Sequence, residues 1–161
     1  NFDIYKKIIN EFGNGILDKN KKIDRNKLGN IVFEDNKKLE KLNSIIHPII
    51  IEEIKNEINR IKNKCKDKIK IVIDAPLLFE AEAKDLVHKI IVVKTNKENI
   101  LKRLSKKYSK TKIEKILKAQ MQLNKKLKYT DFVVDNNKGI NHLKKQVDNI
   151  TKELQKTHQQ S

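Results

Sequence analysis

A run of seven residues near the middle of the chain, residues 68–74, most restricts the fold that this sequence can adopt. The run reads Lys-Ile-Lys-Ile-Val-Ile-Asp, so β-branched residues lead almost without interruption to a carboxylate. This pattern predicts a strand buried on both faces, as in a parallel sheet. A second such run covers residues 89–93, and a short helical stretch is expected between the two around residues 80–87. A β-α-β order requires a crossover connection, which predicts an α/β fold with a parallel sheet.

The N-terminal part of the chain is expected to be helical. Residues 2–12 carry apolar side chains at helical spacing and are followed by glycines, which predicts one amphipathic helix. A second short helix is expected to begin at Asp24, and Asp35 is placed to cap a third. We expect the pair His47-Pro48 to interrupt this third helix, with a long helix continuing from the proline.

Further start signals follow the second β-branched run. Thr95 and Thr111 are each followed three residues later by a glutamate, which is the spacing of a capping box and predicts the start of a helix. Residues 132–134 predict a third strand, and residues 140–154 predict a closing helix.

Polar side chains come directly after two of the predicted strands. Asp74 ends the first strand and Asn136 follows the third. In open parallel sheets ligands bind at the carboxyl ends of the strands, so both residues are expected at the same crevice. The pattern around Asp74 fits magnesium binding, substrate contact and helix capping, and it leaves these alternatives open.

The composition limits the partners of this chain. Lys and Arg number 37 against 21 Asp and Glu, and the formal net charge of +16 should attract nucleotides, phosphate esters or nucleic acid. Nucleic acid is not the favoured partner, because the lysines are scattered and aromatic residues make up only 5% of the chain. Cys65 is the single cysteine, so no internal disulfide can form, which fits a reducing cytoplasm. Without a membrane-length apolar run or a signal-peptide pattern, we expect an intracellular protein with no membrane partner.

Motifs spread along the chain are together similar to those of one enzyme family. Residues 74–80 read Asp-Ala-Pro-Leu-Leu-Phe-Glu, and other matching motifs occur in the same order and at similar spacing: Phe12-Gly13, Asp24-Arg25, Ile46-His47-Pro48, Arg103-Leu104, Ala119-Gln120-Met121 and the run 131–136. The sequence resembles dephospho-coenzyme A kinases from residue 1 to about residue 154.

This resemblance implies a P-loop fold of the nucleoside monophosphate kinase type. In such a fold, helices flank a parallel sheet. A helical substrate-binding subdomain and a lid are attached to this core. The expected boundaries are a helical CoA-binding region at residues 1–66, an α/β core at residues 67–96 and 130–156, and a lid with connecting helices at residues 97–129. The implied reaction is the last step of coenzyme A biosynthesis. ATP donates its γ-phosphoryl group to the ribose 3′-hydroxyl of dephospho-CoA, with Mg²⁺ bridging the phosphates.

The resemblance also implies roles for individual residues. A first group would bind dephospho-CoA: His47, Asp74, Pro76, Leu77, Phe79 and Glu80. Asn136 would contact the nucleotide. Arg103 would be a catalytic arginine of the lid, and Lys107 stands near the position of a second lid arginine. No side chain of this chain is expected to ligate a metal directly.

One element of the family pattern is not found in these 161 residues. Phosphoryl transfer in this fold uses a G-x-x-x-x-G-K-[ST] loop after the first strand, and none of the four glycines begins such a sequence. We therefore expect the first strand and the P-loop to be missing. We favour a fragment of a longer gene product over an inactive remnant, with no turnover by this chain alone. Two alternatives stay open: another nucleotide or nucleoside kinase of related fold, and a noncatalytic basic binding module.

Overall fold

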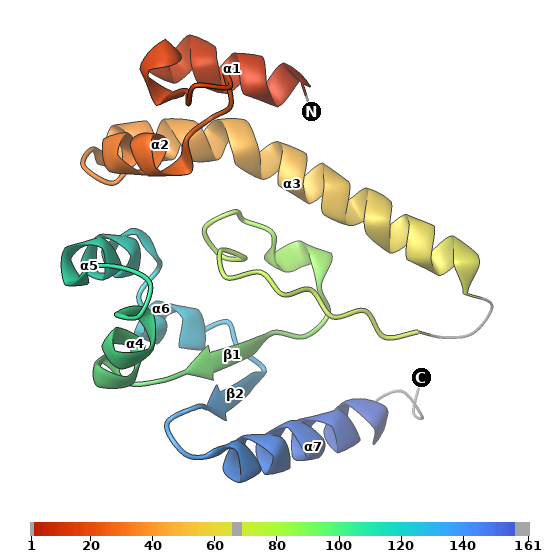
Figure 1. The fold of residues 1–161 in the computed structure, drawn as a ribbon. Coiled ribbons are helices and arrows are strands. Elements are labelled where there is room, and N and C mark those ends of the chain that lie inside the picture. The colour runs from red at the N-terminus through yellow and green to blue at the C-terminus, as the bar shows by residue number, and fades with distance from the viewer. Residues whose placement is uncertain (1, 66–68, 157–161) are drawn as a thin grey trace. The chain divides into compact units, whose positions relative to one another are not determined.

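The computed structural model describes residues 2–65 and 69–156, and Figure 1 shows its elements in chain order. The chain divides into two compact units, of which the first ends at Leu86 and the second begins at Val87. Helices dominate the first unit, whereas the second contains a parallel sheet with helices, so the predicted α/β class is confirmed. Within the described ranges, no helix is both long and apolar enough to cross a bilayer.

The first unit opens with the predicted helices. These are α1 (Phe2–Phe12), α2 (Arg25–Val32) and α3 (Asn36–Lys64), with a short 3-10 helix η1 (Asn14–Ile16) after α1. Asp24 and Asp35 are the N-caps of α2 and α3, and each carboxylate accepts hydrogen bonds from two backbone N–H groups of the first turn. The predicted helix start at Asp24 and the predicted cap at Asp35 are therefore confirmed, and each carboxylate satisfies donors that have no partner within the helix.

The core of the first unit lies between these helices. Its buried side chains come from α1, η1 and α2, and residues of α3 pack against them. The buried members are Ile8, Ile16, Leu28 and Val32. Gly13 directly follows the last residue of α1; it has a φ of 76° and donates its N–H to the carbonyl of Ile9 at 2.7 Å. Glycine adopts this left-handed conformation without a Cβ penalty, so the predicted stop is confirmed.

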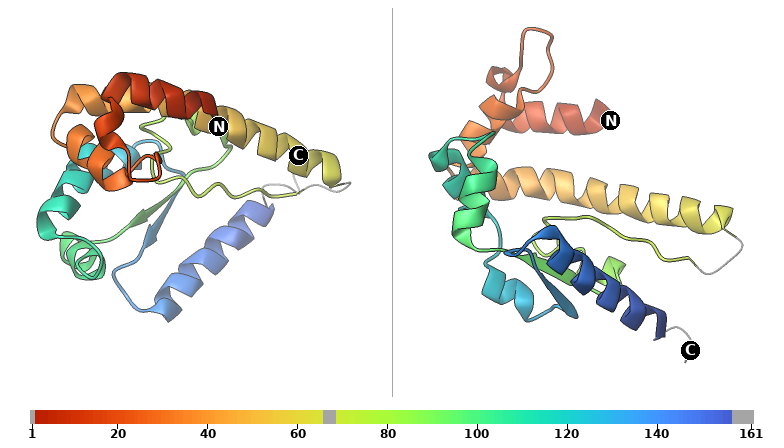
Figure 2. Two further views of the ribbon diagram at one scale, coloured as in Figure 1. Left: turned by 45° about the horizontal axis from the view of Figure 1, so that its top comes forward. Right: turned by 60° about the horizontal axis from the view of Figure 1, so that its bottom comes forward.

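The predicted interruption at Pro48 is wrong. Helix α3 continues through Pro48, and Figure 2 shows it as one uninterrupted helix. A proline inside a helix removes one hydrogen bond and crowds the preceding turn, at a cost of about 3 kcal/mol. Packing on the N-terminal side of the proline offsets this cost, because Leu42, Ile45 and Ile46 contact the core of the first unit. Tertiary contacts thus keep helical a segment that local chemistry would divide.

The strand predicted at residues 68–74 is also not formed. Residue 68 lies outside the described residues, and residues 69–74 have no regular secondary structure. A strand needs a neighbour to pair its backbone groups. Apart from these residues, the described part of the first unit contains helices, turns and an isolated bridge between Leu17 and Ile23. It therefore offers residues 69–74 no strand to pair with. Val72 is 89% exposed, so the predicted burial on both faces is wrong as well. The helical stretch expected near residues 80–87 is a turn followed by a 3-10 helix, η2 (Lys84–Leu86).

The second unit is built on two parallel strands, β1 (Ile91–Lys94) and β2 (Phe132–Asp135). The register places Ile91 opposite Phe132 and Lys94 opposite Asp135. These strands match the predicted runs at residues 89–93 and 132–134, and they pair in parallel. The crossover predicted between residues 68–74 and 89–93 is wrong, because residues 69–74 do not form a strand. Val92 and Val134 are the buried residues of the two strands, at 8% and 3% exposure.

Helices connect and flank the two strands. The crossover contains α4 (Lys97–Leu104), α5 (Lys110–Ala119) and α6 (Leu123–Leu127), and α7 (Ile140–Lys156) packs against β2. The two capping boxes are wrong in detail. Asn96 and Ser109 are the N-caps of α4 and α5, and each accepts a backbone N–H with its side chain. Thr111 lies inside α5 instead of before it.

Candidate functional site

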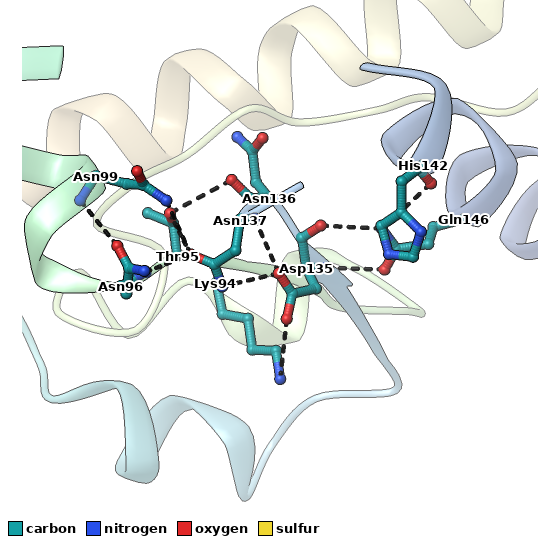
Figure 3. Close-up of polar contacts among 9 residues, drawn as sticks. All are labelled: Lys94, Thr95, Asn96, Asn99, Asp135, Asn136, Asn137, His142 and Gln146. Atoms are coloured by element: carbon teal, nitrogen blue, oxygen red, sulfur yellow. Dashed lines mark hydrogen bonds and ion pairs between the residues drawn. The ribbon is translucent and has the colours of Figure 1, made fainter. Parts of the chain in front are cut away.

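The carboxyl ends of β1 and β2 lie side by side because the strands are parallel. β1 leads into Thr95 and Asn96, and β2 leads into Asn136 and Asn137 (Figure 3). The N–H of Asn136 donates to the carbonyl of Lys94 at 2.8 Å, which extends the pairing one step beyond the ladder. This edge is where a parallel sheet presents polar groups to a ligand.

Arg103 reaches this edge from α4. Its Nη2 donates to the carbonyl oxygen of Asn136 at 3.0 Å. Two residues that the sequence singled out separately are thus brought together, 33 positions apart in the chain. A guanidinium carries five N–H donors in a planar fork, so one carbonyl contact leaves capacity for phosphate oxygens. The arrangement places a cation beside the turn in which a nucleotide contact was predicted.

Asp135 organises the turn after β2. Its Oδ1 accepts the backbone N–H of Asn137 at 2.9 Å, and its Oδ2 forms an ion pair with the Lys94 ammonium at 3.5 Å. The Asn137 backbone N–H makes the largest contribution that lowers the pKa of Asp135, with smaller ones from the Asn137 side chain and Lys94. The carboxylate therefore stays ionised and keeps the turn closed.

Gln146 from α7 closes the outer edge of β2 beside the same turn. Its Oε1 accepts the N–H of Asp135 at 2.9 Å, while its Nε2 donates to the carbonyl of Asp135 at 3.0 Å. A side-chain amide that pairs both groups of one residue imitates a neighbouring strand. Figure 3 shows Gln146 beside the end of β2, where it joins α7 to the strand.

Lys107 lies in the turn after α4. Its N–H donates to the carbonyl of Leu104 at 2.9 Å, and its ammonium lies 5.4 Å from the ring centroid of Tyr108. Lys112 approaches the same ring at 5.2 Å. The aromatic face attracts both ammonium groups, so two positive charges lie beside Tyr108 between α4 and α5.

A pocket of about 280 Å³ lies nearby, between α4 and α5. It is lined by Leu101, Lys102, Ser105, Lys110 and Ile113, none of which was among the predicted site residues.

The first unit contains the other predicted residues, and those from Pro76 to Glu80 lie in a turn that follows residue 75. Ala81 donates its N–H to the carbonyl of Leu77 at 2.9 Å, and Ala83 donates to that of Leu78 at 2.9 Å. Glu82 between them has a φ of 54°, so this helical turn ends in a left-handed residue. This six-to-one bond around a left-handed residue is typical of a helix C-terminus. The segment from Pro76 to Glu80 therefore lies in a turn that is closed by its own backbone hydrogen bonds.

His47 and Glu80 lie close enough to interact within the first unit. His47 stands in the middle of α3 and Glu80 in the turn, and both are half-buried. Burial lowers the pKa of His47, and the negative charge of Glu80 partly opposes that shift. The net effect favours a neutral imidazole near pH 7, which can both donate and accept a hydrogen bond.

The remaining predicted residues of the first unit differ in exposure. Asp74 and Pro76 are exposed, Leu77 is 40% exposed, and Phe79 is half-buried. Asp74 therefore presents its carboxylate to solvent, on a segment without strand pairing. The predicted strand that was to carry it is absent, while its role in binding stays a prediction.

The structure also assigns contacts that the sequence did not suggest. Asn137, Asn99 and Gln146 all participate in the network at the ends of β1 and β2. The signal was present in part, because the pair Asn136-Asn137 directly follows one strand and Thr95-Asn96 the other. No group of three or more His, Cys, Asp or Glu side chains able to hold a metal occurs among residues 2–65 and 69–156.

Comparison with known proteins identifies the family. The family model for dephospho-CoA kinase matches residues 1–142. A dephospho-CoA kinase from Fusobacterium nucleatum is 43% identical over 147 residues, covering 90% of this chain and 74% of that protein. A dephospho-CoA kinase structure from Campylobacter jejuni has a TM-score of 0.59 at 28% identity and covers 98% of this chain and 84% of its own. A Thermus thermophilus crystal structure at 20% identity shares the fold, with a TM-score of 0.70 over 95% of this chain and 78% of its own. The chain belongs to the dephospho-CoA kinase family.

Proposed function

We propose that this protein takes part in ATP-dependent phosphorylation of the ribose 3′-hydroxyl of dephospho-CoA, the last step of coenzyme A biosynthesis. The observation that carries the proposal is the family match over residues 1–142, together with relatives that bear the name dephospho-CoA kinase. The segment Asp-Ala-Pro-Leu-Leu-Phe-Glu at residues 74–80 adds the most specific local support. The single cysteine is compatible with a cytoplasmic enzyme.

The first unit supplies the groups that bind dephospho-CoA in this proposal. Asp74 accepts a hydrogen bond from the substrate, and the exposed apolar side chain of Leu77 offers it a contact surface. His47 and Glu80 hold the base of the turn, since their electrostatic interaction links α3 to it. The supporting observation is that backbone hydrogen bonds close the turn that carries Leu77 and Glu80, so these two groups share one local frame.

The second unit supplies the groups for ATP. Asn136 contacts the nucleotide at the end of β2, and Arg103 stabilises negative charge on the transferred phosphoryl oxygens. Lys107 adds a second positive charge from the turn after α4. The contact between Arg103 and the carbonyl of Asn136 supports this assignment, because it joins a phosphate-binding group to the nucleotide turn.

Magnesium enters the proposal as an ion carried by the phosphates of ATP. A hard cation with oxygen ligands fits that role, and it neutralises charge on the phosphates when bound. The described residues do not assemble a set of side chains that would hold such an ion unaided. We therefore assign no step of the reaction to a protein metal ligand.

Calorimetry tests the substrate assignment. We expect the 161-residue chain to bind dephospho-CoA without turning over ATP, because its sequence contains no G-x-x-x-x-G-K-[ST] loop. Asp74→Asn should weaken binding about tenfold, the loss expected for one charge-assisted hydrogen bond. Asp85→Asn, the same change at another exposed aspartate of the first unit, should leave binding unchanged. Absence of binding heat at high dephospho-CoA concentration would refute the proposal.

A salt titration separates this proposal from a noncatalytic basic binding module. The net charge of +16 gives any anion some affinity, but such binding falls steeply with added salt and ignores the chemistry of the ligand. Specific binding should keep a preference for dephospho-CoA over equally charged anions that are not substrates of the proposed reaction, even at elevated salt. Equal affinities that decline together would favour the basic module.

A further inference from the structure

Asn137 is the most highly connected side chain at the ends of β1 and β2. Its Oδ1 accepts hydrogen bonds from Thr95 Oγ1 at 2.9 Å, the Asn96 N–H at 2.7 Å and Asn99 Nδ2 at 3.2 Å. Its Nδ2 donates to Oδ1 of Asp135 at 2.8 Å. Figure 3 shows this amide between the turn after β2 and the start of α4. One side chain thus ties together the ends of both strands.

The chemistry of the partners fixes how this amide must point. A backbone N–H such as that of Asn96 can only donate, and an ionised carboxylate such as Asp135 can only accept. The side chain between them therefore needs an acceptor on one side and a donor on the other. Asparagine provides both at this length, whereas aspartate would place a second carboxylate against Asp135.

These bonds determine the conformation of Asn136, which stands between Asp135 and Asn137. The N–H of Asn136 donates to the carbonyl of Lys94 at 2.8 Å, and its own carbonyl accepts from Arg103 at 3.0 Å. With both neighbours fixed, the backbone of Asn136 has little freedom. Loss of the Asn137 amide would release the turn and, with it, the carbonyl that orients Arg103.

We propose that Asn137 is a positioning residue for nucleotide binding: it holds the turn of residues 135–137 so that Asn136 and Arg103 face the nucleotide. Asn137 acts through these two residues and does not itself need to contact the ligand. The inference rests on the proposed function, in which Asn136 contacts ATP. It extends that function by naming the residue on which the geometry of the contact depends.

The substitution Asn137→Asp tests the proposal with almost no change of shape. At pH 7.5 the new carboxylate faces Asp135, and we expect about tenfold weaker ATP binding by calorimetry than for the wild type. The proximity of Asp135 raises the pKa of the introduced acid, so it takes up a proton as the pH falls. The protonated acid can donate to Asp135 as the amide does. The ratio of variant to wild-type affinity should therefore recover toward pH 5.5, which simple loss of packing would not produce.

Two further variants guard against misfolding. Asn141→Asp, the same substitution on the exposed surface of α7, should match the wild type at both pH values. The double variant Asp135→Asn with Asn137→Asp exchanges the two side chains. An amide at position 135 can then donate to a carboxylate at position 137. This double variant should bind ATP more tightly than Asn137→Asp alone at pH 7.5. Failure of the exchange to improve on the single variant would contradict the proposal.

NMR spectra of the backbone amides distinguish failure of this inference from failure of the proposed function. In the wild type, ATP should shift the amide signal of Asn136. If that signal does not move while ATP binds, the nucleotide role of Asn136 fails, and the positioning role fails with it. If the signal moves equally in the wild type and in Asn137→Asp, the nucleotide role stands and the positioning role of Asn137 is wrong.

Discussion

Residues 69–74 and the pair β1–β2 have similar sequences but different structures. Each is a run of β-branched residues that leads into polar side chains. In the second unit, the runs pair in a parallel ladder that buries Val134 to 3% exposure. In the first unit, residues 69–74 pair with no described strand, and Val72 is 89% exposed. The same local preference thus gives a strand only where a second strand is available.

The difference extends to the polar residues that follow each run. The ends of β1 and β2 are held in a network that includes Asp135, Asn137 and Gln146. Asp74 lies on unpaired backbone and is exposed. The polar groups at the ends of β1 and β2 are therefore preorganised by the fold, which would reduce the conformational entropy lost on binding a ligand there. The turn after Asp74 is closed by backbone hydrogen bonds within the turn, and its Glu80 interacts with His47 of α3.

The largest expected effect comes from placing a charge in each region. Val134→Asp should destabilise the second unit by about 4 kcal/mol, because an unpaired carboxylate would be buried in β2. Val72→Asp should change the unfolding free energy by no more than about 0.5 kcal/mol, since that side chain is exposed. Urea denaturation followed by circular dichroism measures both. A large loss of stability in Val72→Asp would show that residues 69–74 are buried in solution and would remove the contrast.

The sequence predicted the elements whose signals are local. Asp24 and Asp35 cap helices, residues 132–135 form a strand, and Asn136 lies at its carboxyl end, as expected. The errors involve residues whose conformation depends on distant partners. Pro48 stays helical because α3 packs against the core on its N-terminal side. Thr95 does not cap α4, because its hydroxyl bonds to Asn137, 42 positions away.

The polar network at the strand ends could be predicted only in outline. The sequence placed Asn136 at a polar edge, but it did not indicate which amide would connect the ends of the two strands. Gln146 lies on α7 among charged residues and has the appearance of a surface position. Its bonds to the backbone of Asp135 depend on how α7 packs against β2, which no local pattern specifies.

An effect of intermediate size is expected on the stability of the second unit at acidic pH. Hydrogen bonds from Lys89 and from the N–H of Ile90 lower the pKa of Asp131, and bonds within the turn lower that of Asp135. Both values lie below the ordinary aspartate value of about 3.9 expected in the unfolded chain. As the pH falls, these carboxylates therefore take up protons at a higher pH in the unfolded chain than in the folded protein. The stabilisation is complete above that ordinary value and is lost as the pH falls through the folded pKa values.

Removing the Lys89 ammonium tests this in the second unit. Lys89→Met should raise the pKa of Asp131 toward its ordinary value and weaken the loss of stability in acid, because the largest cause of the shift is gone. Lys70→Met, the same change in the exposed segment of the first unit, should leave Asp131 unaffected. NMR titration of the carboxyl carbons measures the pKa directly. An unchanged Asp131 in Lys89→Met would mean that the 2.8 Å contact between Lys89 and Asp131 does not persist in solution.

The smallest expected effect tests whether the turn that follows residues 69–74 has a fixed conformation in solution. Glu82 adopts a left-handed φ of 54°, which costs a non-glycine residue about 1–2 kcal/mol, whereas glycine adds about 0.5–1 kcal/mol of chain entropy to lose on folding. Glu82→Gly should therefore stabilise the first unit by roughly 0.5 kcal/mol. Glu53→Gly, inside α3, should destabilise it by about 1 kcal/mol. Opposite signs in urea denaturation would show that the turn after Asp74 is a fixed structure. If both variants lose stability alike, the left-handed conformation of Glu82 does not persist in solution, and the groups proposed to bind substrate in this turn would have to be ordered by the ligand.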